Sequence, residues 1–188
     1  MPPKVKITKE DIIKTALELI RTSGEQSVNA RAIACSLNCS TQPIFSNFIN
    51  MDALLKEVIK AGYDCYLNFL KREVESEKYP KYKAFGMGYI HFAKEEKELF
   101  KLLFMRDRTG EVNEYSPDFE QSVQMIVDTT GISPEKARLM HLEMWTCVHG
   151  IATMLVTSFV ALDWELISNV LTDVYQGVRA RHLTEVGK

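Results

Sequence analysis

Apolar residues recur every three or four positions along most of the chain, which is the spacing of an amphipathic α-helix. The first such segment lies between Thr8 and Gly24, and its apolar stripe consists of Ile12, Ile13, Ala16, Leu17 and Ile20. The alternation and turn dipeptides that mark β-strands are absent from the sequence. The pattern therefore predicts an all-α fold.

Three short helices are expected before a series of longer ones. The expected helices cover about residues 8–24, 30–37, 40–47, 51–78, 81–94, 96–106, 118–129, 134–161 and 163–182. Thr8 and Asp11 have the spacing of a capping box, and Asn29, Ser40 and Asn50 stand where N-caps are expected. This order predicts an N-terminal head at residues 1–50 and a larger helical body at residues 51–188.

Charge is distributed unevenly between the two ends of the chain. The 188 residues have a formal net charge of −2, but residues 1–60 carry +2 and the remainder carries −4. A mildly basic head fits a protein that reads nucleic acid. Because 46% of the residues are apolar, the chain can bury a sizeable core, and disorder is not expected.

One apolar run is long enough to raise the question of a membrane span. Residues 144–162 contain no Asp, Glu, Lys or Arg, and His149 is their only side chain that titrates near neutral pH; a span needs about 20 residues. Glu143 and Asp163 flank the run, with no Lys or Arg close to either end. We therefore expect a helix that is covered by its own domain and by a partner subunit, with no membrane contact.

The cysteines do not have the spacing of a metal site. Cys35, Cys39, Cys65 and Cys147 form no Cys-x-x-Cys pair, and the histidines form no zinc-spaced pair. Cys35 and Cys39 are expected to pack as small apolar residues. Scattered thiols and the lack of an apolar export signal suggest a reducing compartment, so we expect a cytoplasmic protein without a metal or cofactor.

Residues 30–48 have the spacing of a helix-turn-helix. Such a unit needs a small residue where two helices touch, a residue that tolerates positive φ in the turn, and an apolar residue that faces back from the second helix. Ala34, Asn38 and Ile44 meet the usual offsets of four and six. The small core expected around them comprises Ile12, Leu17, Ile20, Ile33, Leu37, Ile44 and Phe48. A three-helix packing unit without a DNA-binding role is the alternative.

The run from Asn29 to Leu55 resembles the DNA-binding head of TetR-family repressors. The resemblance is carried by Ile33-Ala34, Asn38, Ser40, Phe45, Phe48 and Leu54-Leu55. Trp145 and His149-Gly150 also resemble the Trp…His-Gly signature of one TetR C-terminal subfamily. The resemblance implies a homodimeric regulator of transcription that binds a palindromic operator and responds to a small apolar effector.

The expected DNA contacts follow from placing the third helix in the major groove. Thr41, Gln42 and Phe45 would face the bases, and Gln42 could pair with adenine. The full set of expected DNA contacts is Arg31, Ser40, Thr41, Gln42, Phe45, Ser46, Asn47 and Lys56.

The chain departs from the family pattern in the charge of this segment. Phe45 replaces the usual Tyr and Met51 the usual Lys, and no Lys or Arg occurs between Arg31 and Lys56. Phosphate contacts then depend on Arg31, Lys56 and three N-terminal lysines, which are Lys4, Lys6 and Lys9. A helical adaptor or ligand-binding protein with a degenerate head therefore remains the alternative function.

The C-terminal half is expected to contain an effector site and a dimer interface. Candidate effector contacts are Phe85, Tyr89, Phe104, Met125, His141 and Trp145. Candidate dimer contacts are Ile151, Leu155, Phe159, Leu166, Val170 and Val174, on two helices that could form a four-helix interface with a partner. For each aromatic or Met residue, a plain core role is the alternative. No nucleophile–base pair or phosphate loop stands out, so no enzyme chemistry is expected.

Overall fold

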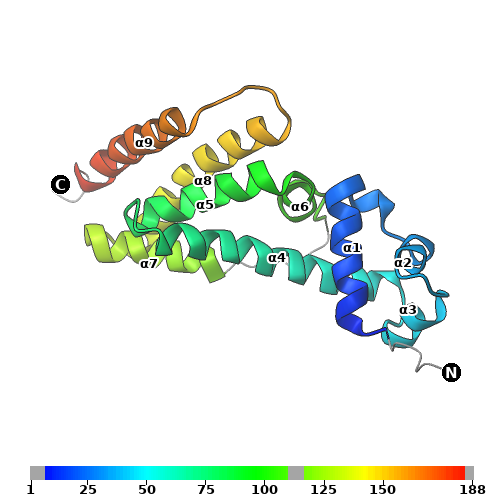
Figure 1. Ribbon diagram of the computed structural model, residues 1–188. Helices are drawn as coiled ribbons and strands as arrows, with labels where there is room; N and C mark the ends of the chain where they lie inside the picture. Colours follow the sequence, from blue (N-terminus) through cyan, green and yellow to red (C-terminus); the bar gives the residue numbers. More distant parts are fainter. Residues whose placement is uncertain (1–6, 110–116, 185–188) are drawn as a thin grey trace. The chain divides into compact units, whose positions relative to one another are not determined.

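The computed structural model describes residues 7–109 and 117–184, and these residues form nine α-helices (Figure 1). The helices are α1 (Lys9–Ser23), α2 (Ala30–Ser36), α3 (Gln42–Asn47), α4 (Met51–Glu75), α5 (Lys81–Glu95), α6 (Lys97–Phe100), α7 (Pro117–Thr130), α8 (Pro134–Val156) and α9 (Trp164–Thr184). A 3₁₀ turn at Glu25–Ser27 and a π-helical turn at Lys101–Met105 complete the elements. The all-α prediction is confirmed.

The chain divides into two compact units. One comprises Met1–Leu67 and Glu96–Asp107, and the other comprises Asn68–Glu95 and Arg108–Lys188. The division falls inside α4 and not at residue 50, because α4 is one continuous helix and because α6 packs against α1. A functional boundary at residue 50 stays a prediction. Below, the two units are called the head unit and the body unit.

The start of α1 is fixed by the capping box that the sequence predicts. The Thr8 hydroxyl accepts a hydrogen bond from the Asp11 amide at 3.1 Å, and the Asp11 carboxylate accepts one from the Thr8 amide at 2.9 Å. The bonds from Thr8 lower the pKa of the Asp11 carboxyl. Ile12, Ala16 and Ile20 on the inner face of α1 are fully buried. Thus the apolar stripe of the first helix forms the core of the head unit.

The helix-turn-helix has the geometry that its spacing predicts. Asn29 caps α2 by accepting a hydrogen bond from the Ala32 amide at 3.0 Å, and Asn38 in the turn has a φ of 50°. Ala34 on α2 and Ile44 on α3 are buried, and both helices pack against α1. Asparagine tolerates this left-handed backbone better than other residues with a Cβ atom, which explains why it can stand where glycine is more usual.

The predicted cap of the third helix is wrong. Ser40 lies outside the helix, α3 begins at Gln42, and Thr41 precedes it without a side-chain capping bond. The carbonyl oxygen of Thr41 instead accepts hydrogen bonds from the Ile44 and Phe45 amides. Pro43 in the first turn has no N–H group, so one fewer donor needs a capping partner. By contrast, Asn50 does cap α4, through a 2.8 Å bond from the Ala53 amide.

The body unit is organised around α8, which packs against α5, α7 and α9 (Figure 1). By length and composition alone α8 could cross a membrane, but 44% of its most apolar window is already buried inside the fold. Ala137, Met140 and Ala152 on α8 are fully buried. A helix surrounded on several sides by other helices needs apolar residues around most of its circumference, which accounts for the composition of residues 144–156.

The end of α8 differs from the prediction. The helix stops at Val156, five residues before the expected end, and Ser158 has a φ of 55°. The connection to α9 is therefore a loop rather than a short turn at Leu162-Asp163. Phe159 lies in this loop with 81% of its surface exposed.

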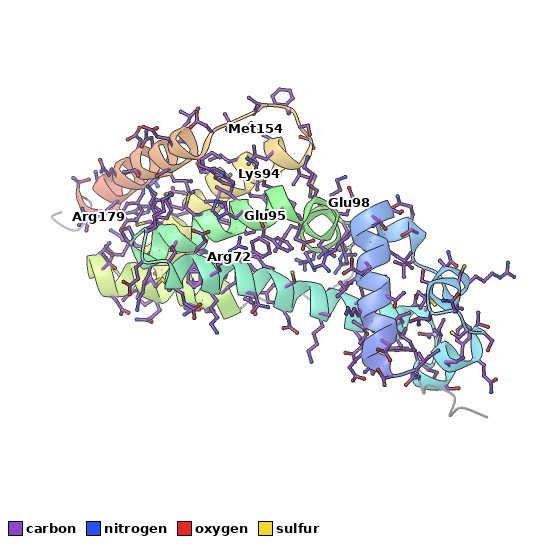
Figure 2. All side chains as sticks on the ribbon, viewed as in Figure 1. Arg72, Lys94, Glu95, Glu98, Met154 and Arg179 are labelled. Atoms are coloured by element: carbon purple, nitrogen blue, oxygen red, sulfur yellow. The ribbon has the colours of Figure 1, made fainter. Side chains whose placement is uncertain are left out.

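Polar contacts on the surface of the body unit link α4 to α5 and α5 to α9. Arg72 of α4 pairs with Glu95 of α5 at 3.2 Å, and both residues are labelled in Figure 2. Lys94 lies 4.6 Å from the ring centroid of Trp164, at the start of α9. Because these contacts are exposed, they contribute little stability compared with the buried apolar faces.

Helices α4 and α5 approach each other closely at Gly88. A Cβ atom at Gly88 would lie 3.0 Å from the Leu70 Cα atom and 3.1 Å from the Phe69 carbonyl oxygen. A backbone cannot move aside as a side chain can, so we expect Gly88→Ala to destabilise the fold by roughly 1–3 kcal/mol. Urea unfolding measures this difference.

Gly86, on the same helix, offers a matched control. Its added Cβ atom would meet only side-chain atoms, the nearest being a Val148 methyl at 3.3 Å. Gly86→Ala carries the same gain in helix propensity, so its stability should stay close to that of the wild type or rise slightly. Equal losses in the two variants would contradict the close approach at Gly88.

Candidate functional site

The short helix α3 presents most of its side chains to solvent. Gln42, Ser46 and Asn47 are exposed, and Phe45 has 52% of its surface exposed, whereas Ile44 faces inward and is fully buried. Since Phe45 is not taken up by the core of the head, it is free to contact a partner. Ser46 and Asn47 donate hydrogen bonds to the carbonyl oxygens of Gln42 and Pro43, at 2.9 and 2.7 Å.

Few cations accompany α3 in the part of the head that the structure describes. Arg31 and Lys56 are exposed. Lys9 pairs with Glu57 at 2.9 Å, and Lys9 lowers the pKa of the Glu57 carboxyl. The Lys9 ammonium also lies 5.4 Å from the ring centroid of Phe48. Two other expected phosphate contacts, Lys4 and Lys6, lie outside the described residues.

An exposed apolar residue next to α3 was not among the residues predicted from the sequence. Ile49 follows the helix directly and has 90% of its surface exposed, the largest value among the exposed apolar residues. Because α3 ends at Asn47 and Phe48 is extended, Ile49 lies outside the helix. Helical periodicity therefore could not predict that its side chain is exposed. Phe45 and Ile49 are thus two exposed apolar side chains, on and next to α3, that could contact a partner.

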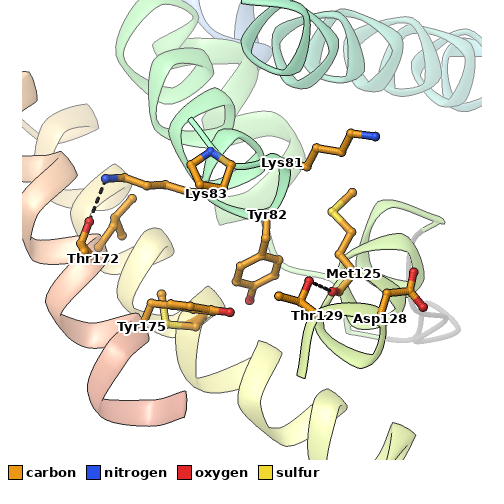
Figure 3. Close-up of a pocket in the computed structure, with 12 residues that line it drawn as sticks. Lys81, Tyr82, Lys83, Met125, Asp128, Thr129, Thr172 and Tyr175 are labelled. Atoms are coloured by element: carbon orange, nitrogen blue, oxygen red, sulfur yellow. Dashed lines mark hydrogen bonds between the residues drawn. The ribbon is translucent and has the colours of Figure 1, made fainter. Parts of the chain in front are cut away.

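A cavity of about 540 Å³ lies in the body unit (Figure 3). It is lined by Pro80, Lys81, Tyr82, Lys83, Gly86, Met125, Asp128, Thr129, Met144, Leu171, Thr172 and Tyr175. These residues come from the start of α5 and from α7, α8 and α9, so the wall consists of helix faces that are distant in the sequence. Pockets of this size and mainly apolar lining are typical of small-molecule sites.

The aromatic wall of the cavity is held in place by a histidine behind it. The Tyr82 hydroxyl and the His141 Nδ1 atom are 2.9 Å apart, and the Phe119 ring lies edge-on to His141 at 4.5 Å between centroids. Burial raises the pKa of Tyr82 and lowers the pKa of His141 to about 4. At neutral pH the phenol therefore keeps its proton, and its O–H group donates a hydrogen bond to the unprotonated Nδ1 atom. The Tyr175 ring faces Tyr82 at 5.7 Å.

The residues predicted to contact an effector are distributed over several places. Met125 lines the cavity, and His141 lies directly behind it against Tyr82. Phe85 is half-buried and is not among the lining residues. Phe104 belongs to the head unit, where its ring contacts Tyr66 and Phe100. The expected helix at 96–106 is in fact α6 followed by the π-helical turn, which directs this segment to α1.

The remaining two predicted effector contacts belong to a separate aromatic cluster. The Tyr89 hydroxyl lies 2.8 Å from the His149 Nδ1 atom, and the Trp145 ring stacks on His149 at 4.9 Å between centroids. Burial lowers the pKa of His149. Trp145 and His149 are four residues apart on α8, so they share one face of the helix. This explains the spacing of the Trp…His-Gly sequence as a packing motif.

Sequence reasoning missed most of the residues that line the cavity. Tyr82 and Lys83 stand at the start of a helix, and Thr172 is a polar residue of α9, so no apolar periodicity singles them out. The one available signal was the spacing of Leu171 and Tyr175, four residues apart on α9.

The predicted dimer contacts divide into buried and exposed residues. Ile151 and Leu155 on α8 are 5% and 8% exposed, because they already pack inside their own body unit. On α9, Leu166 is 46% exposed, and Val170 and Val174 are half-buried. Two further apolar residues of α8, Leu139 and Leu142, are 49% and 47% exposed.

No group of three or more His, Cys, Asp or Glu side chains in the described ranges could hold a metal ion. The four cysteines are free thiols, and burial raises the pKa of Cys65 and Cys147. Buried thiols with a raised pKa are poor nucleophiles.

The head unit thus holds a helix-turn-helix whose second helix is exposed, and the body unit holds a cavity lined by four helices. Residues 82–173, just under half of the chain, match the sequence family described as tetracyclin repressor-like, C-terminal domain. The matched domain is one of repressors, which are regulators and not enzymes. No curated protein matches the sequence significantly.

Solved structures share the fold over nearly the whole chain. A protein of unknown function from Rhodococcus sp. RHA1 is 18% identical, with a TM-score of 0.72 over 96% of this chain and 97% of that one. A protein described as regulatory, SCO4313, is 20% identical, with a TM-score of 0.66 and coverages of 88% and 94%. A TetR variant from Acinetobacter baumannii AYE in complex with minocycline is 17% identical, with a TM-score of 0.61 and coverages of 94% and 99%. The chain thus has a TetR-like fold.

Proposed function

We propose that this protein is a ligand-responsive transcriptional regulator, acting as a repressor, that binds a palindromic operator as a homodimer in the cytoplasm. The observation that carries the proposal is the exposed face of α3 on a helix-turn-helix with a well-formed turn. The match of residues 82–173 to a repressor-like domain supports it. Assignment to the Trp…His-Gly subfamily stays a prediction.

In the proposed complex α3 lies in the major groove. Gln42 has the side chain that pairs with adenine through two hydrogen bonds, and Thr41 and Phe45 can contact a thymine methyl group. Phosphate contacts are assigned to Arg31, Ser40, Ser46, Asn47 and Lys56, which are exposed around α3. In a two-fold symmetric dimer, two such helices would read half-sites about 34–36 Å apart.

The proposed effector site is the cavity of the body unit. The TetR variant from Acinetobacter baumannii AYE was solved with minocycline bound, so this fold can accommodate a small ligand. An effector would act here if it binds more tightly to a conformation in which the two heads of the dimer no longer fit the operator. Tyr82, Met125 and Tyr175 are the residues proposed to contact the apolar part of the effector.

Homodimerisation is proposed through α8 and α9. A helical pair from each subunit would form a four-helix interface around the two-fold axis. The exposed apolar residues Leu142 and Leu166 and the half-buried Val170 and Val174 are the side chains that such an interface would cover. Ile151 and Leu155 would support it from inside each subunit.

A second candidate function is a helical ligand-binding adaptor whose head no longer binds DNA. It is favoured by the lack of any Lys or Arg between Arg31 and Lys56, and by the pairing of Lys9 with Glu57. Phosphate contacts supply much of the affinity of DNA-binding proteins. A head with few available cations would then bind DNA weakly or not at all.

DNA binding by Gln42→Ala and Arg31→Ala separates the two functions. Using DNA from beside its own gene, we expect Gln42→Ala to lose roughly 1–3 kcal/mol on the cognate duplex and almost nothing on a scrambled one. Arg31→Ala should weaken binding to both duplexes by similar factors, since a phosphate contact carries no sequence information. Fluorescence anisotropy over a salt series measures both effects.

The salt series also tests how many cations of the head contact phosphates. Each neutralised phosphate adds about 0.9 to the logarithmic salt slope, so a shallow slope is expected. Equal losses on both duplexes for Gln42→Ala would reject its role in reading bases. A wild-type protein that shows no sequence preference at any salt concentration would favour the adaptor.

A further inference from the structure

We infer that the cavity of the body unit takes an organic anion with an aromatic body, and that Lys83 binds its carboxylate. The inference rests on the proposed effector function of the cavity and defines the chemical class of that effector. It departs from the purely apolar effector that the sequence suggests, because the cavity contains a cation that sequence reasoning did not identify.

Lys83 is positioned as an anion-binding group. Its ammonium is half-buried and donates hydrogen bonds to the hydroxyls of Ser168 at 2.7 Å and Thr172 at 2.8 Å. Lysine has three N–H donors, so one remains for a ligand. Within the described residues no carboxylate lies at ion-pair distance from this ammonium. The ammonium also lies 4.9 Å from the ring centroid of Tyr79, which is a neutral contact as well. A half-buried cation whose partners are all neutral gains more from a bound anion than a fully paired one would.

The two hydroxyls hold the ammonium without competing for the anion. The Thr172 hydroxyl donates its own proton to the Ser168 carbonyl oxygen at 2.9 Å, so its lone pairs accept from Lys83. Both residues lie on α9, whereas Lys83 lies on α5. The ammonium is therefore fixed between two helices at one edge of the cavity.

The cavity is polarised along its length. Figure 3 shows Lys83 and Thr172 on one side of Tyr82, and Asp128 with Thr129 on the other. Lys81 also lies on the Asp128 side, but its side chain is exposed and extends away from Tyr82. Asp128 accepts a hydrogen bond from the Gln124 side chain at 2.7 Å and carries the negative charge of that end. Repulsion from Asp128 and attraction to Lys83 give an anionic ligand one preferred orientation.

The space between these ends fits an aromatic body. The rings of Tyr82 and Tyr175 lie 5.7 Å apart, and Met125, Met144 and Leu171 complete the apolar lining. Aromatic and Met side chains make close contacts with flat apolar ligands and adjust to their shape. The volume of about 540 Å³ is in the range of sites for drug-sized molecules.

Two matched probes, 2-naphthoate and 2-naphthamide, test the inference. They share one ring system and differ in charge. By isothermal titration calorimetry on the full chain without DNA, we expect naphthoate to bind about tenfold more tightly than naphthamide, as a charged hydrogen bond predicts. Lys83→Met should weaken naphthoate binding by about tenfold and leave naphthamide within about twofold.

Two further variants serve as controls. Lys71→Met makes the same charge change on α4, where that side chain is 71% exposed, and should leave both affinities unchanged. Asp128→Asn, at the exposed opposite end, should tighten naphthoate by about twofold and not naphthamide. This second variant keeps the test decisive if circular dichroism shows that Lys83→Met does not fold.

Three results would overturn the inference. These are equal affinity of the wild type for the two probes, equal losses of both probes in Lys83→Met, and no binding of either probe up to millimolar concentrations. Because no DNA is present, each of these results leaves the DNA-binding proposal intact. Conversely, loss of DNA binding in the anisotropy experiment would not change the affinities of the probes.

Discussion

The Leu166→Asp variant is expected to sediment as a monomer at micromolar concentrations at which the wild-type chain sediments as a dimer. Leu166 lies in the first turn of α9 and is 46% exposed although it is a large apolar residue. In the proposed interface an aspartate here would be an unpaired charge covered by the partner subunit. A cost of about 3 kcal/mol at even one of the two sites would weaken dimerisation about a hundredfold.

Ile49→Asp is the matched control for this experiment. It makes the same change at a residue of the head that is 90% exposed, so it should leave both folding and dimerisation unchanged. Circular dichroism checks that both variants are folded. Ile151 and Leu155 are unsuitable for this test because they are buried within their own subunit, where a charge would unfold the protein. A wild-type monomer, or a dimeric Leu166→Asp variant, would reject the interface.

Lowering the pH from 7 towards 4 is expected to destabilise the fold through His141. Burial lowers the pKa of His141 from the ordinary value of 6.5 to about 4, although Asp118 and Glu120 act in the opposite direction. Because the folded pKa lies below the unfolded one, the stabilisation is complete above pH 6.5 and is lost as the pH falls towards 4. At 1.36 kcal/mol per unit, the loss reaches about 3 kcal/mol at the acidic end.

Comparison with His141→Gln isolates this contribution. Glutamine cannot titrate in this range, and its side-chain oxygen can accept the hydrogen bond from Tyr82. The carboxylates of the chain titrate in both proteins, so their effects cancel in the difference. Between pH 7 and pH 5 we expect the wild type to lose roughly 2 kcal/mol more than the variant in urea unfolding. Parallel pH profiles of the two proteins would show that His141 is not held neutral by burial.

The head could be predicted from the sequence because its structure depends on neighbouring residues. The capping box of Thr8 and Asp11, the cap at Asn29 and the turn at Asn38 are each formed within a few positions of one another. Such local hydrogen bonds and backbone preferences are encoded in short segments. The failure at Ser40 has the same local character, because Pro43 removes a donor that a cap would otherwise bind.

The interior of the body unit is less accessible to sequence reasoning. Apolar periodicity shows that a helix has a buried face, but it does not show which helix covers that face. Phe104 illustrates this limit, since its aromatic ring fits a cavity wall as well as it fits its actual place beside Tyr66 in the head unit. Ile151 and Leu155 have the spacing of an interface and yet are buried within one subunit.

The sequence by itself determined the all-α fold, the helix-turn-helix and the side chains that α3 exposes, since each depends on helical periodicity, caps and one turn residue. Only the tertiary structure decided where the cavity lies, since its walls come from α5, α7, α8 and α9, and which polar groups enter it. Lys83 in particular is one lysine among many in the sequence, and it becomes distinctive only because α9 brings two hydroxyls, and no carboxylate among the described residues, to its ammonium.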